Sequence, residues 1–123
     1  MKDDIRVILA DNNVQDRESK KRLLNEQGIQ VVYETGDGKK ALENIKKLKP
    51  DVVVMDMILP GVDGLEILEE CREFTEYKPL FIIATALRRE GLIEQALAQG
   101  ANYYMMKPLS ATMLIKRIRQ PQP

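Results

Sequence analysis

Short apolar runs alternate along the chain with longer amphipathic segments, and a turn signal stands at nearly every change. Five runs rich in β-branched or aromatic residues predict strands, at residues 5–10, 29–33, 51–56, 80–84 and 102–106. Between them, apolar residues recur at helical spacing and predict helices at residues 14–27, around 41–48, around 65–71, at 90–99, and from an N-cap at Ser110 to about 119. Gly28 and Gly100 close two of these helices, Gly36 and Gly38 form a turn, and Pro50 stops the second helix.

This order of elements predicts one doubly wound α/β domain with a five-stranded parallel sheet and five helices, of the flavodoxin-like kind. Strands that alternate with helices of about ten residues require crossover connections, which cover both faces of a sheet. The runs at 5–10, 51–56 and 80–84 are almost wholly apolar, as central parallel strands are. The 123 residues suit a single domain, which we place at 1–119, and residues 120–123 are interpreted as the start of a linker or the cut end of a longer chain.

The amino-acid composition argues against several classes of function. The chain has 19 basic and 19 acidic residues, which argues against a general nucleic-acid or membrane-surface binder. A single cysteine excludes an internal disulfide, and no stretch resembles a membrane span or a signal peptide, so we expect a cytoplasmic protein. Histidine is absent, which excludes Ser-His and Cys-His catalysis and His-ligated zinc. Any chemistry must use carboxylates, amides, hydroxyls and lysines, and the oxygen ligands among them suit a hard cation such as magnesium or calcium.

Polar residues follow four of the predicted strands directly. They are Asp11-Asn12-Asn13, Asp56, Thr85 and Lys107-Pro108. In open parallel sheets, function gathers at the carboxyl ends of the strands, so these groups should converge on one edge. Each alone is explained better by the solvation of loops, whereas the four together favour a site. Asp56 has the strongest case, because an acid after four apolar residues is poorly explained by packing.

Four stretches carry a resemblance to a known family: ILADNN, DVVVMDMILPGVDGLEIL, IIATA and YYMMKPL. In this order and spacing they resemble the receiver domain of two-component response regulators, and the likeness covers nearly the whole chain. The second stretch is specific even alone. The resemblance implies the CheY-like strand order 2-1-3-4-5. Within the family, DNN and the ending ANYYMMKPL through IKRIRQ are most similar to the receiver of the sporulation master regulator.

The resemblance implies a role for each group at the strand ends. Asp56 would accept a phosphoryl group, helped by Thr85 and Lys107. Magnesium would be held by Asp11, Asn12, Asp56 and the backbone carbonyl of Ile58. The donor would be a partner histidine kinase or phosphotransfer protein, because this chain has no histidine to carry the group.

The family likeness also implies a conformational switch. Thr85 would move toward the phosphoryl group and Tyr104 would rotate inward, although a tyrosine packed on the surface explains the same sequence as well. The face of the fourth helix, fifth strand and fifth helix would then bind a second receiver, giving a homodimer, or an output module that controls transcription. We expect no membrane contact, no direct nucleic-acid binding, and no enzyme activity beyond self-phosphorylation and self-dephosphorylation.

Asn12 departs from the family pattern, which usually has a second acid at this position. Loss of that negative charge should weaken magnesium binding. It favours one alternative, a degenerate receiver that acts only as an interaction module. A second alternative is a small hydrolase or nucleotide binder, which is disfavoured because no glycine-rich phosphate loop follows the first strand. Asp63 is interpreted as a helix cap rather than a metal ligand.

Overall fold

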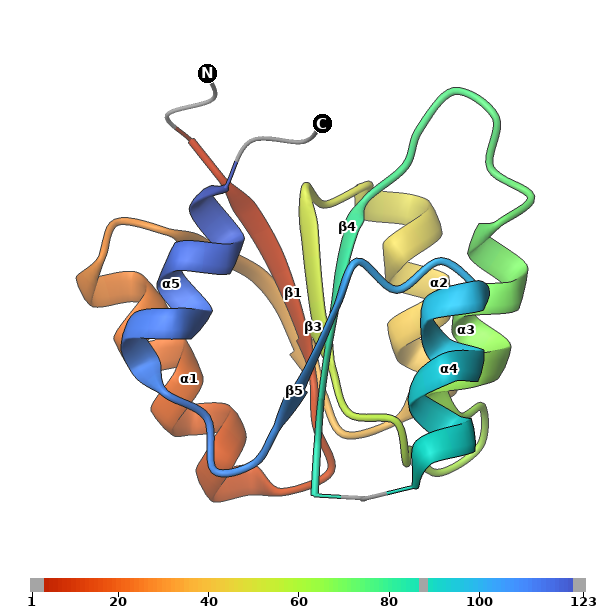
Figure 1. Cartoon of the computed structure of the whole chain (residues 1–123). Helices are drawn as coiled ribbons and strands as arrows, with labels where there is room; N and C mark the ends of the chain where they lie inside the picture. The colour runs from red at the N-terminus through yellow and green to blue at the C-terminus, as the bar shows by residue number, and fades with distance from the viewer. Residues whose placement is uncertain (1–3, 87–88, 121–123) are drawn as a thin grey trace.

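The computed structural model describes residues 4–86 and 89–120, which form the predicted α/β fold (Figure 1). Five parallel strands stand in the order β2-β1-β3-β4-β5, so the flavodoxin-like prediction is confirmed. The strands are β1 (Arg6–Ala10), β2 (Gln30–Thr35), β3 (Val52–Met55), β4 (Leu80–Thr85) and β5 (Tyr103–Met106). The helices are α1 (Val14–Glu26), α2 (Gly38–Leu48), α3 (Gly64–Cys71), α4 (Glu90–Ala98) and α5 (Ala111–Arg119).

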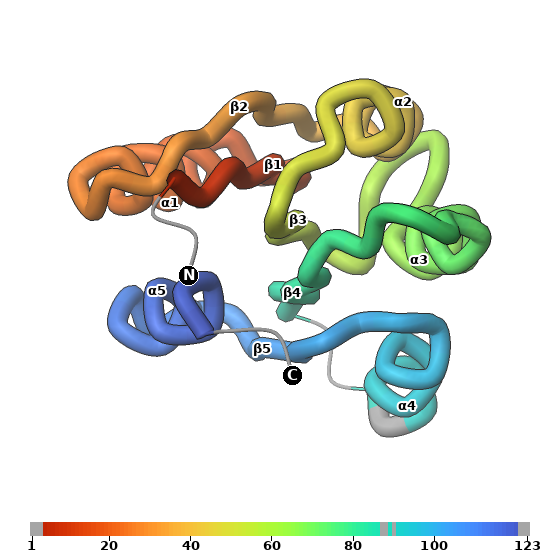
Figure 2. The backbone as a smooth tube through the Cα atoms, turned by 90° about the horizontal axis from the view of Figure 1, so that it is seen from above, coloured from red at the N-terminus to blue at the C-terminus, as the bar shows by residue number. Residues whose placement is uncertain are grey.

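Helices cover both faces of the sheet (Figure 2), with α1 and α5 on one face and α2, α3 and α4 on the other. Two separate apolar cores result from the alternation of side chains along each strand. Val7 and Leu9 of β1 belong to the core beneath α1 and α5, while Ile8 and Ala10 belong to the core on the opposite face. All four residues of β3 are buried. The prediction of central strands buried on both sides is therefore confirmed.

β2 extends two residues beyond the predicted end at residue 33. The prediction was wrong because Glu34 and Thr35 are polar, whereas their backbones pair with Leu9 and Ala10 of β1. Glu34 is satisfied by ion pairs with Lys21 at 2.7 Å and with Arg17 at 3.1 Å. Edge strands admit polar residues when the ladder and side-chain partners satisfy them. The other helices and strands end within one or two residues of their predicted limits.

Asparagine, aspartate and serine side chains cap four helices. Asp63 accepts a hydrogen bond from the N–H of Glu66 at 3.0 Å, and Ser110 accepts one from Met113 at 3.2 Å, so both predicted caps are confirmed. Asn13 caps α1 and Asp37 caps α2 in the same way. The loops that lead into α1, α3 and α5 are thereby fixed beside the ends of their strands.

Gly38 is the first residue of α2, not part of a turn before it as the sequence predicted. The reason is steric, because a Cβ built at Gly38 would lie 1.6 Å from the carbonyl oxygen of Val62, in the loop after β3. The N–H of Gly38 also donates to Pro60 in that loop at 3.0 Å. Glycine is thus required for the close approach of two backbones, and the contact holds the loop that follows Asp56.

Gly38→Ala should lower the free energy of unfolding by about 2–3 kcal/mol, because the added methyl group forces the two backbones apart. Gly91→Ala, in the first turn of α4, is the matched control: apart from its chain neighbours and the backbone of its own helix, no described atom lies within 4 Å of a Cβ built there. That variant should be neutral or slightly more stable. Urea unfolding of both variants measures the difference, and equal stabilities would contradict the steric account.

No helix among residues 4–86 and 89–120 is long and apolar enough to cross a membrane. The predicted linker at 120–123 lies outside the described residues except for Gln120, which follows α5. Cys71, the only cysteine of the chain, is buried at the end of α3.

Candidate functional site

Asp11 and Asp56 directly follow β1 and β3, two strands that are paired in the sheet. The carboxyl edge of the sheet is at the lower end of the strands in Figure 1. Ala10 and Met55, the last residues of β1 and β3, are paired across the sheet. The next residues continue this pairing, because the N–H of Asp56 donates to the carbonyl of Ala10 at 2.8 Å. The ladder therefore brings Asp11 and Asp56 together although 45 positions separate them in the sequence.

Lys107 joins both acids. Its Nζ lies 2.9 Å from Asp11 Oδ2 and 2.9 Å from Asp56 Oδ2, and it follows β5 directly. The N–H of Lys107 donates to the carbonyl of Thr85 at 2.9 Å, which anchors its backbone to the end of β4. The peptide bond to Pro108 is cis. The predicted convergence of these polar groups is therefore confirmed.

The charges at this edge stabilise one another. Burial alone would raise the pKa of Asp11, but hydrogen bonds from Lys107, Lys20 and the N–H of Asn13 outweigh it and leave this pKa below its ordinary value of 3.8. Burial alone would lower the pKa of Lys107. Its hydrogen bonds to Asp11 and Asp56 have the larger effect, so this pKa is raised above its ordinary value. At neutral pH the carboxylate of Asp11 is therefore ionised and Lys107 carries its positive charge.

The lowered pKa of Asp11 predicts a pH dependence of stability. The unfolded chain takes up a proton at this carboxylate more readily than the folded chain, so the stabilisation is fully present above 3.8 and is lost as the pH falls through the folded pKa. Asp11→Asn should lack this contribution. Urea unfolding from neutral pH to about pH 3 should show the two proteins converging in stability as acid is added. A constant difference between them would contradict the assignment.

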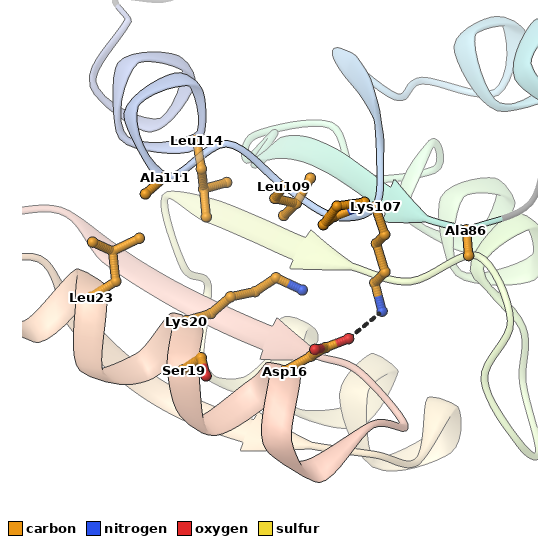
Figure 3. Close-up of a pocket in the computed structure, with 10 residues that line it drawn as sticks. Asp16, Ser19, Lys20, Leu23, Ala86, Lys107, Leu109, Ala111 and Leu114 are labelled. Carbon is orange, nitrogen blue, oxygen red and sulfur yellow. Dashed lines mark hydrogen bonds and ion pairs between the residues drawn. The ribbon is translucent and has the colours of Figure 1, made fainter.

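Two further charged residues reach the site from α1, and the sequence had not singled them out. Lys20 Nζ lies 2.9 Å from Asp11 Oδ2, and Asp16 Oδ2 lies 3.4 Å from Lys107 Nζ. Figure 3 shows both side chains on the helix face that is turned toward Lys107 and Leu114. The spacing of residues in α1 could have revealed Lys20. It lies three residues before Leu23 and four before Leu24, which places it on the apolar face of the helix. A lysine on that face needs a buried partner for its charge.

Thr85 and Tyr104, the predicted switch pair, lie on adjacent strands. Thr85 is 1% exposed at the end of β4, and Tyr104 is half-buried against the core on the α2, α3 and α4 face. Burial, and then the nearby charge of Asp56, raises the pKa of Tyr104. Tyr103 faces the other way, toward the core beneath α1 and α5, and the guanidinium of Arg117 lies over its ring at 4.7 Å.

The remaining predicted metal ligands lie on the rim. The side chain of Asn12 is exposed, and Ile58 is 57% exposed, with its N–H donating to Asp56 Oδ1 at 3.1 Å. In the described part of the chain, no three histidine, cysteine or acidic side chains form a group that could hold a metal ion. Magnesium commonly uses one or two carboxylates and completes its shell with water. Two carboxylates that already share one cation at 2.9 Å fit that requirement.

Comparisons with known proteins agree with this geometry. Residues 7–119 match the family model of the response regulator receiver domain. The transcriptional regulatory protein PdtaR of Mycobacterium tuberculosis is 34% identical over 113 residues, which are 92% of this chain and 54% of that protein, so the chain spans about half the length of this relative.

Two solved structures share the fold closely. The signal receiver domain of a protein described as the response regulator NarL, from Mycobacterium tuberculosis, has a TM-score of 0.88 and 31% identity over 95% of this chain and 94% of that one. CheY in a CheX–CheY–BeF3–Mg2+ complex from Borrelia burgdorferi has a TM-score of 0.85 and 25% identity over 93% of this chain and 86% of that one. The chain therefore belongs to the receiver domains of two-component response regulators.

Proposed function

We propose that the chain accepts a phosphoryl group on Asp56 from a histidine kinase or phosphotransfer protein. The observation that carries the proposal is the position of Lys107, whose ammonium lies 2.9 Å from both Asp56 Oδ2 and Asp11 Oδ2. Of the two acids that Lys107 contacts, Asp56 follows a fully buried strand and is itself partly exposed, whereas Asp11 is buried. A nucleophile with a fixed cation beside it, open to a donor, is what phosphoryl transfer requires.

In this proposal a carboxylate oxygen of Asp56 attacks the phosphorus atom of the donor. A bond from that oxygen to phosphorus forms, the bond from phosphorus to the donor nitrogen breaks, and the donor histidine keeps the electron pair. The product is an acyl phosphate. Lys107 stabilises the charge on one phosphoryl oxygen, as a fixed ammonium does in other phosphoryl transfers. Thr85, at the adjacent strand end, donates its hydroxyl to another.

Magnesium fits the same edge, held by Asp11, Asn12, Asp56 and the carbonyl of Ile58. When bound, it would supply positive charge that offsets the repulsion between the carboxylate and the phosphoryl group. Asp11 is the most deeply placed of these groups at 4% exposure, and it keeps its charge because hydrogen bonds lower its pKa. Asn12 contributes only an amide oxygen, so we expect weaker magnesium binding than a second carboxylate would give.

Phosphorylation then shifts an existing equilibrium between two conformations of the face formed by α4, β5 and α5. Thr85 ends β4, and Tyr104 lies on β5, the adjacent strand, which is part of that face. We propose that the face binds a second copy of the chain or an output module that regulates transcription. The domain catalyses its own phosphorylation and dephosphorylation and no other reaction. The narrower likeness to a sporulation regulator stays a prediction.

One observation favours a second candidate, a receiver that binds partners without being phosphorylated. Asn12 removes one negative charge from the predicted metal site, and Lys20 adds one positive charge at Asp11. If these two changes abolished metal binding, the remaining surface would still present the face of α4, β5 and α5 to a partner.

Intact mass spectrometry after incubation with magnesium and acetyl phosphate separates the two candidates. The proposed function predicts that the chain gains one phosphoryl group, that the gain is lost when magnesium is chelated, and that mild alkali or hydroxylamine removes the group, because acyl phosphates are labile to both. An unchanged mass at saturating donor would favour the phosphorylation-independent module.

A further inference from the structure

Lys20 of α1 places a second ammonium on the most deeply buried acid of the site. Its Nζ lies 2.9 Å from Asp11 Oδ2, the same oxygen that Lys107 contacts at 2.9 Å. The side chains of Lys20 and Asp11 are only 11% and 5% exposed, so water screens their interaction weakly. A cation of the chain itself therefore occupies one face of an oxygen that a divalent cation would need.

We propose that Lys20 is a built-in competitor of the divalent metal ion for Asp11 and sets how tightly this receiver binds magnesium. The inference rests on the proposed function, because it concerns the metal that supports phosphoryl acceptance at Asp56. It goes further by assigning a regulatory role to a residue outside the predicted metal ligands.

Charge gives the direction of the effect. Three carboxylates and two ammonium groups are linked at this edge, from Asp11, Asp16, Asp56, Lys20 and Lys107, and they carry one net negative charge. Removing the ammonium group of Lys20 would leave these side chains with two net negative charges. The affinity of a hard cation rises with the negative charge of its ligands. The ammonium group of Lys20 and the uncharged amide of Asn12 therefore both lower the affinity of the site for magnesium.

Asp16 is an alternative ion-pair partner for Lys20 when the metal binds. Asp16 lies four residues earlier on the same face of α1, at the spacing at which side chains on a helix meet. Both line a cavity of about 650 Å³ between α1 and the start of α5, whose wall includes Leu23, Leu109 and Leu114 (Figure 3). The ammonium can therefore leave Asp11 for Asp16 without entering an apolar space unpaired.

Calorimetric titration of magnesium chloride into the whole chain, without a phosphodonor, tests the competition. Lys20→Met keeps the length of the side chain and its contacts with the cavity wall, and it should bind magnesium roughly tenfold more tightly than the wild type. Lys21→Met is the matched control, because Lys21 pairs with Glu34 Oε2 at 2.7 Å, away from the acids. Its affinity should equal that of the wild type.

A double-mutant cycle with Asp16→Asn tests the exchange of partners. In the wild-type background this variant should weaken magnesium binding several-fold, because Lys20 loses its second partner. In the Lys20→Met background it should have a clearly smaller effect. An effect of equal size in both backgrounds would show that Asp16 acts on the metal directly and would overturn the exchange.

Equal magnesium affinity in the wild type and Lys20→Met, or no binding to either, would overturn the competition. This outcome is distinct from failure of the proposed function, which is judged by phosphorylation of the wild type with acetyl phosphate. Thermal unfolding of each variant shows whether the fold is intact, and Lys20→Met should remain folded because Lys107 still pairs with Asp11.

Discussion

Replacing Asp56 with asparagine should abolish phosphoryl acceptance by this chain. The substitution keeps the shape of the side chain and its position after β3 but removes the anionic oxygen that attacks phosphorus. Lys107 retains its contact with Asp11 at 2.9 Å, so the geometry of the edge should persist. Intact mass spectrometry with magnesium and acetyl phosphate should show no phosphorylated Asp56→Asn protein at donor concentrations that saturate the wild type.

Asp63→Asn provides the matched control for this prediction. Asp63 lies in the same loop and caps α3 through the N–H of Glu66 at 3.0 Å, a role that asparagine fills equally well. The control should therefore be phosphorylated like the wild type. Phosphorylation of Asp56→Asn at the wild-type rate would contradict the proposal that Asp56 is the phosphoryl acceptor.

Lys107→Met should slow phosphorylation by roughly 100-fold, the effect of removing one fixed group that stabilises developing charge. The variant also leaves the neighbouring carboxylates of Asp11 and Asp56 without their shared cation, so the free energy of unfolding should fall by about 1–3 kcal/mol. The rate of mass gain and urea unfolding measure the two effects separately.

Lys47→Met, on the exposed side of α2, controls for the general loss of one positive charge. It should change neither the rate nor the stability appreciably. If Lys107→Met were phosphorylated as fast as the control, the contact between Lys107 and Asp56 would be structural and the proposed catalytic role would be wrong.

The fold could be predicted from the sequence because its central strands carry a strong signal. A run such as Val52–Met55 is apolar throughout, and parallel strands buried on both faces require that composition. The end of β2 could not be predicted, since Glu34 and Thr35 are polar and are held by pairing with β1 and by ion pairs from α1. Gly38 was misplaced for a similar reason: the close approach of Val62, 24 positions away, has no local signature.

The candidate site at the carboxyl edge of the sheet was predictable in part. Asp11, Asp56 and Lys107 each follow an apolar strand directly, so the rule for parallel sheets brought them to one edge before any distance was known. Asp16 and Lys20 come from α1, where charged residues are numerous and only the three-dimensional packing shows which of them turn inward. Two of the five linked charges at this edge therefore come from residues that do not follow a strand, so their position could not be predicted from the strand ends.

Locating the phosphoryl group on the wild-type chain is the most direct test of the central claim. Borohydride reduction of the acyl phosphate, followed by proteolysis and peptide mass spectrometry, converts the modified aspartate to homoserine and thus marks it. The account predicts homoserine at position 56 and at no other acid. Homoserine at Asp11 or Asp16, with Asp56 unmodified, would contradict it.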